Sequence, residues 1–239
     1  GVPPFDKIRA EHFMPAFERG MSLHEAEIDA ITSNNDEPTF ENTILAYDNA
    51  GQMLAQTELI FGMLCAAETN ERMQALQEQV MPLLSAHRDK IRLDEKLFAR
   101  VKDVYDRRAS LGLDAEQSRL LRKTYDAFVR SGALLDAGQK ARLKEINGEL
   151  SLTAVKFGNN ILAENNNFAL ELTADDLEGL PSGVRDAARE KAQAMGKGDK
   201  WVFTLHKPSL IPFLTYSAKR DLREKIYKAY LNRCNNGDQ

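Results

Sequence analysis

The sequence predicts a mainly α-helical protein: a multi-helix scaffold with a small two-stranded hairpin between residues 168 and 205. Three observations support this class. Apolar residues recur at steps of three and four over long stretches, as one face of a helix requires. Glycine and proline are scarce, with 14 and 8 among 239 residues. Only two short segments alternate apolar and polar residues in the way that a half-buried strand does.

Long amphipathic helices are expected over the first two thirds of the chain. Thr39, Asn70 and Asp114 stand where residues that cap a helix belong, and Asp136 starts a further helix. The predicted helices span residues 11–32, 40–67, 71–91, 94–110, 114–131 and 136–164.

The predicted helix 40–67 carries the longest uninterrupted apolar stripe, and the helix would be about 40 Å long. The residues of this stripe follow one helical face: Phe40, Ile44, Tyr47, Gly51, Leu54, Phe61 and Cys65. In the helix 136–164, we expect a similar stripe to point inward: Leu143, Ile146, Leu150, Phe157 and Ile161. Leu83 is expected inside as well, on the helix 71–91.

The pattern changes at Asn165, which divides the chain into a long-helix subdomain (1–164) and a mixed segment (165–239). Residues 168–172 and 201–205 read as two paired strands. Between and after them we expect a short helix over 173–180, a helix over 183–195 that Ser182 caps, an apolar turn between Pro208 and Pro212, and a last helix over 219–233.

Composition excludes several functions. The net charge of −4 gives no basic field for nucleic acid. No stretch reaches the roughly 18 apolar residues of a membrane helix. Cys65 and Cys234 are too few for a disulfide framework, and Cys65 should be a buried free thiol. A cytoplasmic location fits these features, and an exported parent protein stays open.

The residues themselves indicate no active site. None of the four histidines (His12, His24, His87 and His206) has a second histidine four residues away, so the HExxH helix of zinc peptidases is absent. His24-Glu25 begins such a motif, but residue 28 is Ile28, and we interpret His24 as a surface residue. His206 is expected to cap or pack. We therefore assign no catalytic residue and no metal ligand, and the substrate-binding residues remain unassigned.

An ordered set of motifs resembles the thimet oligopeptidase and peptidyl-dipeptidase family of zinc metallopeptidases, the bacterial peptidyl-dipeptidases above all. One matching segment is residues 38–44, and its most specific block is Thr39-Phe40-Glu41-Asn42-Thr43-Ile44. The other matching segments, in order, are residues 4–8, 11–13, 15–17, 27–31, 176–181, 201–205, 220–225 and 227–230.

The resemblance implies a helical protein with two halves that face each other across a channel for short unfolded peptides. The family's zinc ligands come from an HExxH helix and a later glutamate, and neither is in this sequence. We therefore expect zinc in the parent protein and none bound by this chain. The chain would be the N-terminal wall of the channel, inactive alone, and its partners would be short peptides and the missing C-terminal catalytic domain.

One alternative stays open: a free-standing helical module that binds peptides or a partner protein. The two hypotheses differ in the surface they predict. A channel wall should expose an apolar face where the catalytic domain docks, whereas an independent module should not.

Overall fold

A computed structural model describes residues 2–235 and 237. It confirms the predicted class, because helices dominate and the described residues contain one two-stranded sheet. The chain forms two compact units, Gly1–Val155 and Lys156–Gln239. Among the described residues, no helix combines the length and the apolar character needed to cross a membrane.

The first unit is built from helices whose ends follow the predicted caps. The side chains of Thr39, Asn70 and Asp114 each accept a backbone amide at the start of a helix. The elements are η1 (Ala10–His12), α1 (Phe13–Thr32), η2 (Phe40–Leu45), α2 (Ala46–Asp48), α3 (Gln52–Ala67), α4 (Glu71–Arg92), α5 (Glu95–Asp106), η3 (Arg108–Ser110), α6 (Ala115–Arg130) and α7 (Ala137–Asn167). The boundary between the two units lies within α7, and the expected boundary near Asn165 lies close to the end of this helix.

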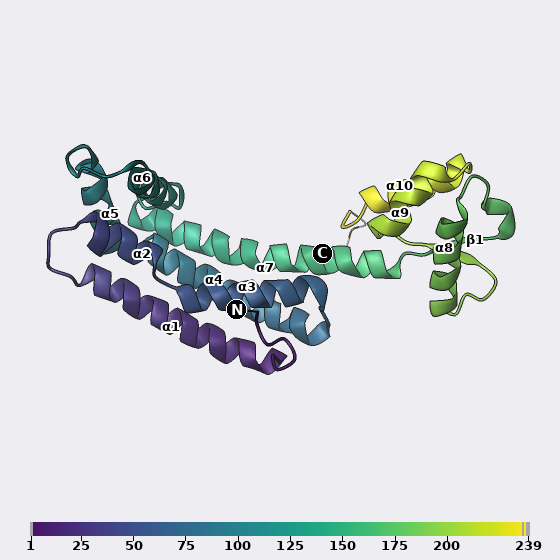
Figure 1. Cartoon of the computed structure of the whole chain (residues 1–239), viewed down its shortest axis with the longest axis horizontal. Coiled ribbons are helices and arrows are strands. Elements are labelled where there is room, and N and C mark those ends of the chain that lie inside the picture. Colours follow the sequence, from purple (N-terminus) through teal and green to yellow (C-terminus); the bar gives the residue numbers. More distant parts are fainter. Residues whose placement is uncertain (1, 236, 238–239) are drawn as a thin grey trace. The chain divides into compact units, whose positions relative to one another are not determined.

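Two apolar clusters hold the first unit together. Helices α1, α3 and α4 lie side by side (Figure 1), and Phe13 and Phe17 of α1 pack against Phe61 of α3 with ring centroids 5.0 and 5.3 Å away. The second cluster joins η2, α5 and α6 around fully buried side chains such as Ile44 and Phe128. Burial of such side chains is the main stabilising contribution to folding.

The predicted single helix over 40–67 is wrong. A π-helical turn, η2, leads into the short α2, and the chain turns before α3 begins. Gly51 at this turn has φ 75°, in the left-handed region that favours glycine. Its amide donates to Glu27 Oε2 at 2.7 Å, so the break is anchored to α1. The apolar spacing continues across the turn, which is why periodicity alone did not reveal it.

The inward stripe expected on α7 is wrong for three of its five residues, whereas Leu143 and Ile161 are half-buried. Within the first unit, Ile146 and Leu150 are 43% and 62% exposed, and within the second unit Phe157 is 54% exposed. Leu83 of α4 is exposed as well. Spacing identifies an apolar face, but the burial of that face needs another element to cover it.

The second unit surrounds a small sheet. Strands β1 (Leu170–Leu172) and β2 (Trp201–Phe203) are antiparallel, with Leu170 opposite Phe203, which confirms the predicted pairing. The remaining elements are η4 (Ala174–Asp176), α8 (Ser182–Ala194), α9 (Lys207–Tyr216) and α10 (Arg220–Leu231). Lys197 and Lys200 hydrogen-bond the carboxylate of Glu171 and lower its pKa to about 2.

Two local predictions in this unit are wrong. Residues around Pro208 and Pro212 form the helix α9 instead of a turn. Pro208 falls in the first helical turn, where an amide would have no partner inside the helix, so the ring is tolerated there. Ser182 does not cap α8, because Pro181 occupies the capping position and no side chain caps this helix.

Candidate functional site

A pocket of about 910 Å³ opens in the first unit. Residues from α1, α2, α3, α4, the end of α6 and the start of α7 line it. They combine histidines, arginines, one tyrosine, acidic and amide groups with apolar side chains: His24, Tyr47, Ala50, Gly51, Leu54, Ala55, Glu58, Leu59, His87, Arg88, Asp89, Ile91, Arg92, Arg130, Ser131, Leu143 and Asn147.

Two histidines meet at one side of the pocket. His24 Nδ1 of α1 lies 3.1 Å from His87 Nε2 of α4, so one of these nitrogens donates to the other. His87 is buried and His24 is half-buried, which corrects the prediction of a surface His24. Gly51 makes this position available, because a Cβ there would lie 2.8 Å from His24 Nδ1.

Burial and the neighbouring charged groups determine the protonation of the two histidines. Burial lowers the pKa of both imidazoles; the neighbouring His87 lowers that of His24 further, and Glu25 opposes the shift at His87. His87 Nδ1 lies 3.5 Å from Glu25 Oε1, which is longer than an ordinary hydrogen bond, so this is an ionic contact at most. Lys90 pairs with the same carboxylate at 2.9 Å and lowers its pKa.

This cluster does not suit a metal ion. Among residues 2–235 and 237, no group of three or more histidine, cysteine, aspartate or glutamate side chains is arranged to hold one. Zinc requires three or four such ligands. A zinc site of the implied family therefore does not fit the residues described here.

The pocket lining also carries three arginines, Arg88, Arg92 and Arg130. Arg88 is paired with Glu58 of α3, and Asn147 Nδ2 donates to Asp89 Oδ1 at 2.8 Å. Arg92 and Arg130 have no hydrogen bond or ion pair within the described part of the chain. This grouping could not be predicted from the sequence, because its members lie on α4 and α6, far apart along the chain.

The other singled-out residues do not line this pocket. His12 and His206 are exposed, and His206 stands at the capping position of α9 without a side-chain cap. Cys65 is half-buried, less than expected, and burial raises the pKa of its thiol. Cys65 forms no disulfide within the described part of the chain, and Cys234 Sγ lies 3.5 Å from the carbonyl oxygen of Phe157.

Sequence comparison adds relatives to this geometry. The chain is 37% identical over 238 residues to dipeptidyl carboxypeptidase from Escherichia coli (strain K12), and 36% identical over 240 residues to the enzyme of that name from Salmonella typhimurium. It is 26% identical over 234 residues to oligopeptidase A from Salmonella typhimurium. These alignments cover 98–99% of this chain. No protein-family model matches it.

Over nearly its whole length the chain is similar to one portion of enzymes of the thimet oligopeptidase and peptidyl-dipeptidase family. It corresponds to the N-terminal portion of these relatives and spans about 35% of the length of the dipeptidyl carboxypeptidases. The predicted resemblance is thereby confirmed.

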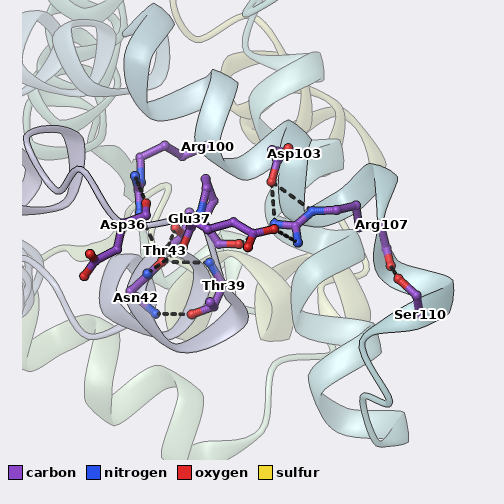
Figure 2. A network of polar contacts seen from close by, with 10 residues as sticks. Asp36, Glu37, Thr39, Asn42, Thr43, Arg100, Asp103, Arg107 and Ser110 are labelled. Atoms are coloured by element: carbon purple, nitrogen blue, oxygen red, sulfur yellow. Dashed lines mark hydrogen bonds and ion pairs between the residues drawn. The ribbon is translucent and has the colours of Figure 1, made fainter.

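The block that resembles this family most specifically, Thr39–Ile44, has a structural role. Thr39 and Asn42 cap each other's amides at the start of η2, at 2.8 and 3.1 Å. Figure 2 shows the network around this block, in which Arg100 of α5 donates to Asn42 Oδ1 at 3.1 Å and to the backbone of Asp36.

A second arginine, Arg107 directly after α5, completes the network of Figure 2. Arg107 Nε donates to Asp103 Oδ2 at 3.0 Å, and its guanidinium also pairs with Glu37. Together the two arginines fix the loop 33–38 on α5. The block thus contributes to the scaffold and presents no catalytic group.

Proposed function

We propose that the chain is the N-terminal domain of a zinc-dependent oligopeptidase, a peptidyl-dipeptidase that releases C-terminal dipeptides from short peptides. In this proposal the chain forms one wall of the peptide channel and is inactive alone. The observation that carries it is the 37% identity, over 99% of this chain, to 35% of a dipeptidyl carboxypeptidase.

Zinc and the catalytic groups would belong to another part of the parent protein. The sequence has no HExxH motif, and the described residues have no cluster suited to a metal. This chain's contribution would then be to bind and orient peptides and to exclude folded proteins, while zinc in the catalytic domain would activate water for the hydrolysis.

The exposed apolar residues of α7 support a docking role. Ile146 and Leu150 are four residues apart and lie on one face of the helix. A large exposed apolar surface is characteristic of an interaction site. We propose that the catalytic domain covers this face, as the channel-wall hypothesis requires.

The test compares two proteins. One is the 239-residue chain, and the other is the same chain continued by the rest of its source reading frame, or fused to the remaining part of the Escherichia coli relative if the frame ends at residue 239. Both are incubated with an N-acetylated tetrapeptide, and the released dipeptide is measured before and after chelation and after addition of zinc.

We expect dipeptide release from the extended protein only, its loss on chelation, and its recovery with zinc. Release from the 239-residue chain alone would contradict the proposed division of labour. An extended protein that cleaves no peptide, with or without zinc, would contradict the proposed activity and favour the independent binding module.

A further inference from the structure

We propose that the pocket of the first unit binds a carboxylate of a short peptide, which Arg92 and Arg130 hold while an adjacent apolar side chain rests on the leucines of the pocket. The proposal rests on the proposed function only for the ligand class, short peptides. It assigns a peptide contact to this chain itself.

The first argument is unused positive charge. Arg88, which also lines the pocket, pairs with Glu58. Arg92 and Arg130 have no such partner within the described residues, although both line the pocket. A guanidinium presents several N–H donors in a planar fork that matches the two oxygens of a carboxylate.

The second argument is that the acidic groups of the pocket are already engaged. Glu58 pairs with Arg88, and Asp89 accepts from the side-chain amide of Asn147. Asn147 is neutral, so Asp89 keeps its negative charge, and the positive charges of Arg92 and Arg130 exceed it by one. The histidine pair adds little charge near neutral pH, because burial lowers the pKa of both rings.

The third argument is preorganisation. The Cζ atom of Arg92 lies 5.7 Å from the ring centroid of Phe128, a fully buried residue, so the guanidinium rests on a fixed aromatic surface. The half-buried Tyr47 also lines the pocket, and its hydroxyl has no hydrogen bond to any described residue. Its charge interaction with Arg92 places it near that arginine, so it offers a further donor.

The apolar part of the pocket indicates what should flank the carboxylate. Leu54, Leu59 and Leu143 line it, and Leu59 is 65% exposed although it belongs to a pocket. A ligand side chain of leucine size would cover this surface and gain hydrophobic stabilisation. The volume of about 910 Å³ is sufficient for two or three residues of a peptide.

The test measures binding of four dye-labelled pentapeptides to the 239-residue chain by fluorescence anisotropy. The dye is uncharged and sits on the N-terminus. The peptides end in Leu-Glu or Leu-Gln, each with a free or an amidated C-terminus. This set separates a C-terminal carboxylate from an acidic side chain as the bound group.

We expect at least one carboxylate peptide to bind, and its Kd to rise about tenfold when that carboxylate is replaced by an amide. Arg130→Gln, at an exposed site, and the double variant Arg92→Gln/Arg130→Gln should raise the Kd by a similar or larger factor. Arg122→Gln, on α6 but outside the pocket, is the charge-matched control and should leave the Kd unchanged within about twofold.

Two outcomes would overturn the assignment. In one, the chain binds none of the carboxylate peptides more tightly than the Leu-Gln amide. In the other, the Arg130 and double variants bind as the wild-type chain does while their circular dichroism shows a native fold. The readout is binding, so absence of peptidase activity in the extended protein would count against the proposed function and would leave this result intact.

Discussion

Helices α1 and α7 have similar sequence patterns and opposite environments. Both are long, and both carry apolar residues at steps of three and four. On α1 the stripe is covered, so that Phe13 and Phe17 are buried; on the first-unit part of α7, Ile146 and Leu150 are exposed. A periodic apolar stripe therefore predicts a helix with one apolar face. Whether that face is buried depends on which other elements of the fold pack against it.

The largest expected effect is at the covered stripe. Phe17→Ala should lower the free energy of unfolding of the first unit by about 4 kcal/mol, because the ring is fully buried between Phe13 and Phe61 and the neighbours cannot fill its space. Urea denaturation followed by circular dichroism measures the change.

The matched substitution on the other helix is Phe157→Ala. Because Phe157 is 54% exposed, its loss should change the free energy of unfolding by about 0.5 kcal/mol or less. Equal destabilisation by the two substitutions would mean that α7 is covered in solution, and the comparison between the helices would fail.

A smaller effect is expected at the break between α2 and α3. Gly51→Ala should destabilise the first unit by about 2 kcal/mol, because the residue has positive φ and the new Cβ would meet the His24 ring. Gly148→Ala is the control on α7: it has helical φ and open space, and should stabilise slightly. If the double variant Gly51→Ala/His24→Ala is no more stable than Gly51→Ala, the contact with His24 contributes nothing to the cost.

The break between α2 and α3 shows which features of the fold could be predicted from the sequence and which could not. Caps such as Thr39 and Asn70 were predictable, because a capping side chain acts on amides two or three residues away. Gly51 was not, because its conformation depends on the carboxylate of Glu27 and the ring of His24, both on another helix. The same holds for α9, where Pro208 is compatible with either a turn or a first helical turn.

The candidate site was still less predictable. His24 and His87 are 63 residues apart in sequence, and their contact exists only because α1 packs on α4. Arg92 and Arg130 are ordinary surface arginines in sequence terms, and their lack of acidic partners is a property of the folded chain. Family resemblance was readable from the motifs because it depends on residue order alone.

A pH-dependent effect is expected where α1 meets α4. Burial lowers the pKa of His24 and His87, so the unfolded chain binds more protons than the folded chain below about pH 6.5. Stability should therefore be fully present above that pH and fall as the pH drops through it. Glu25, Glu27, Glu58 and Lys90 face the pair, and Glu25, with a lowered pKa, stays charged over this window.

Urea midpoints of the wild-type chain and of His24→Gln between pH 8 and 5.5 measure this contribution. The variant should lose part of the decline below pH 6.5, while His12→Gln, at an exposed site, should keep the wild-type profile. The effect should be smaller than that of Gly51→Ala because His24 is only half-buried and solvent screens its charge. Identical profiles for wild type and His24→Gln would assign the decline to other groups.

The smallest expected change in the stability of the 239-residue chain is at Leu150 of α7. Leu150→Ser on α7 should change the free energy of unfolding by about 0.5 kcal/mol or less, whereas Leu84→Ser, at a buried position of α4, should cost several times more. In the protein extended by its catalytic domain, Leu150→Ser should become destabilising, because the same side chain would then be covered. Equal tolerance of Leu150→Ser in the short and extended proteins would show that α7 presents its apolar face to solvent in both, and the docking surface would have to be sought elsewhere.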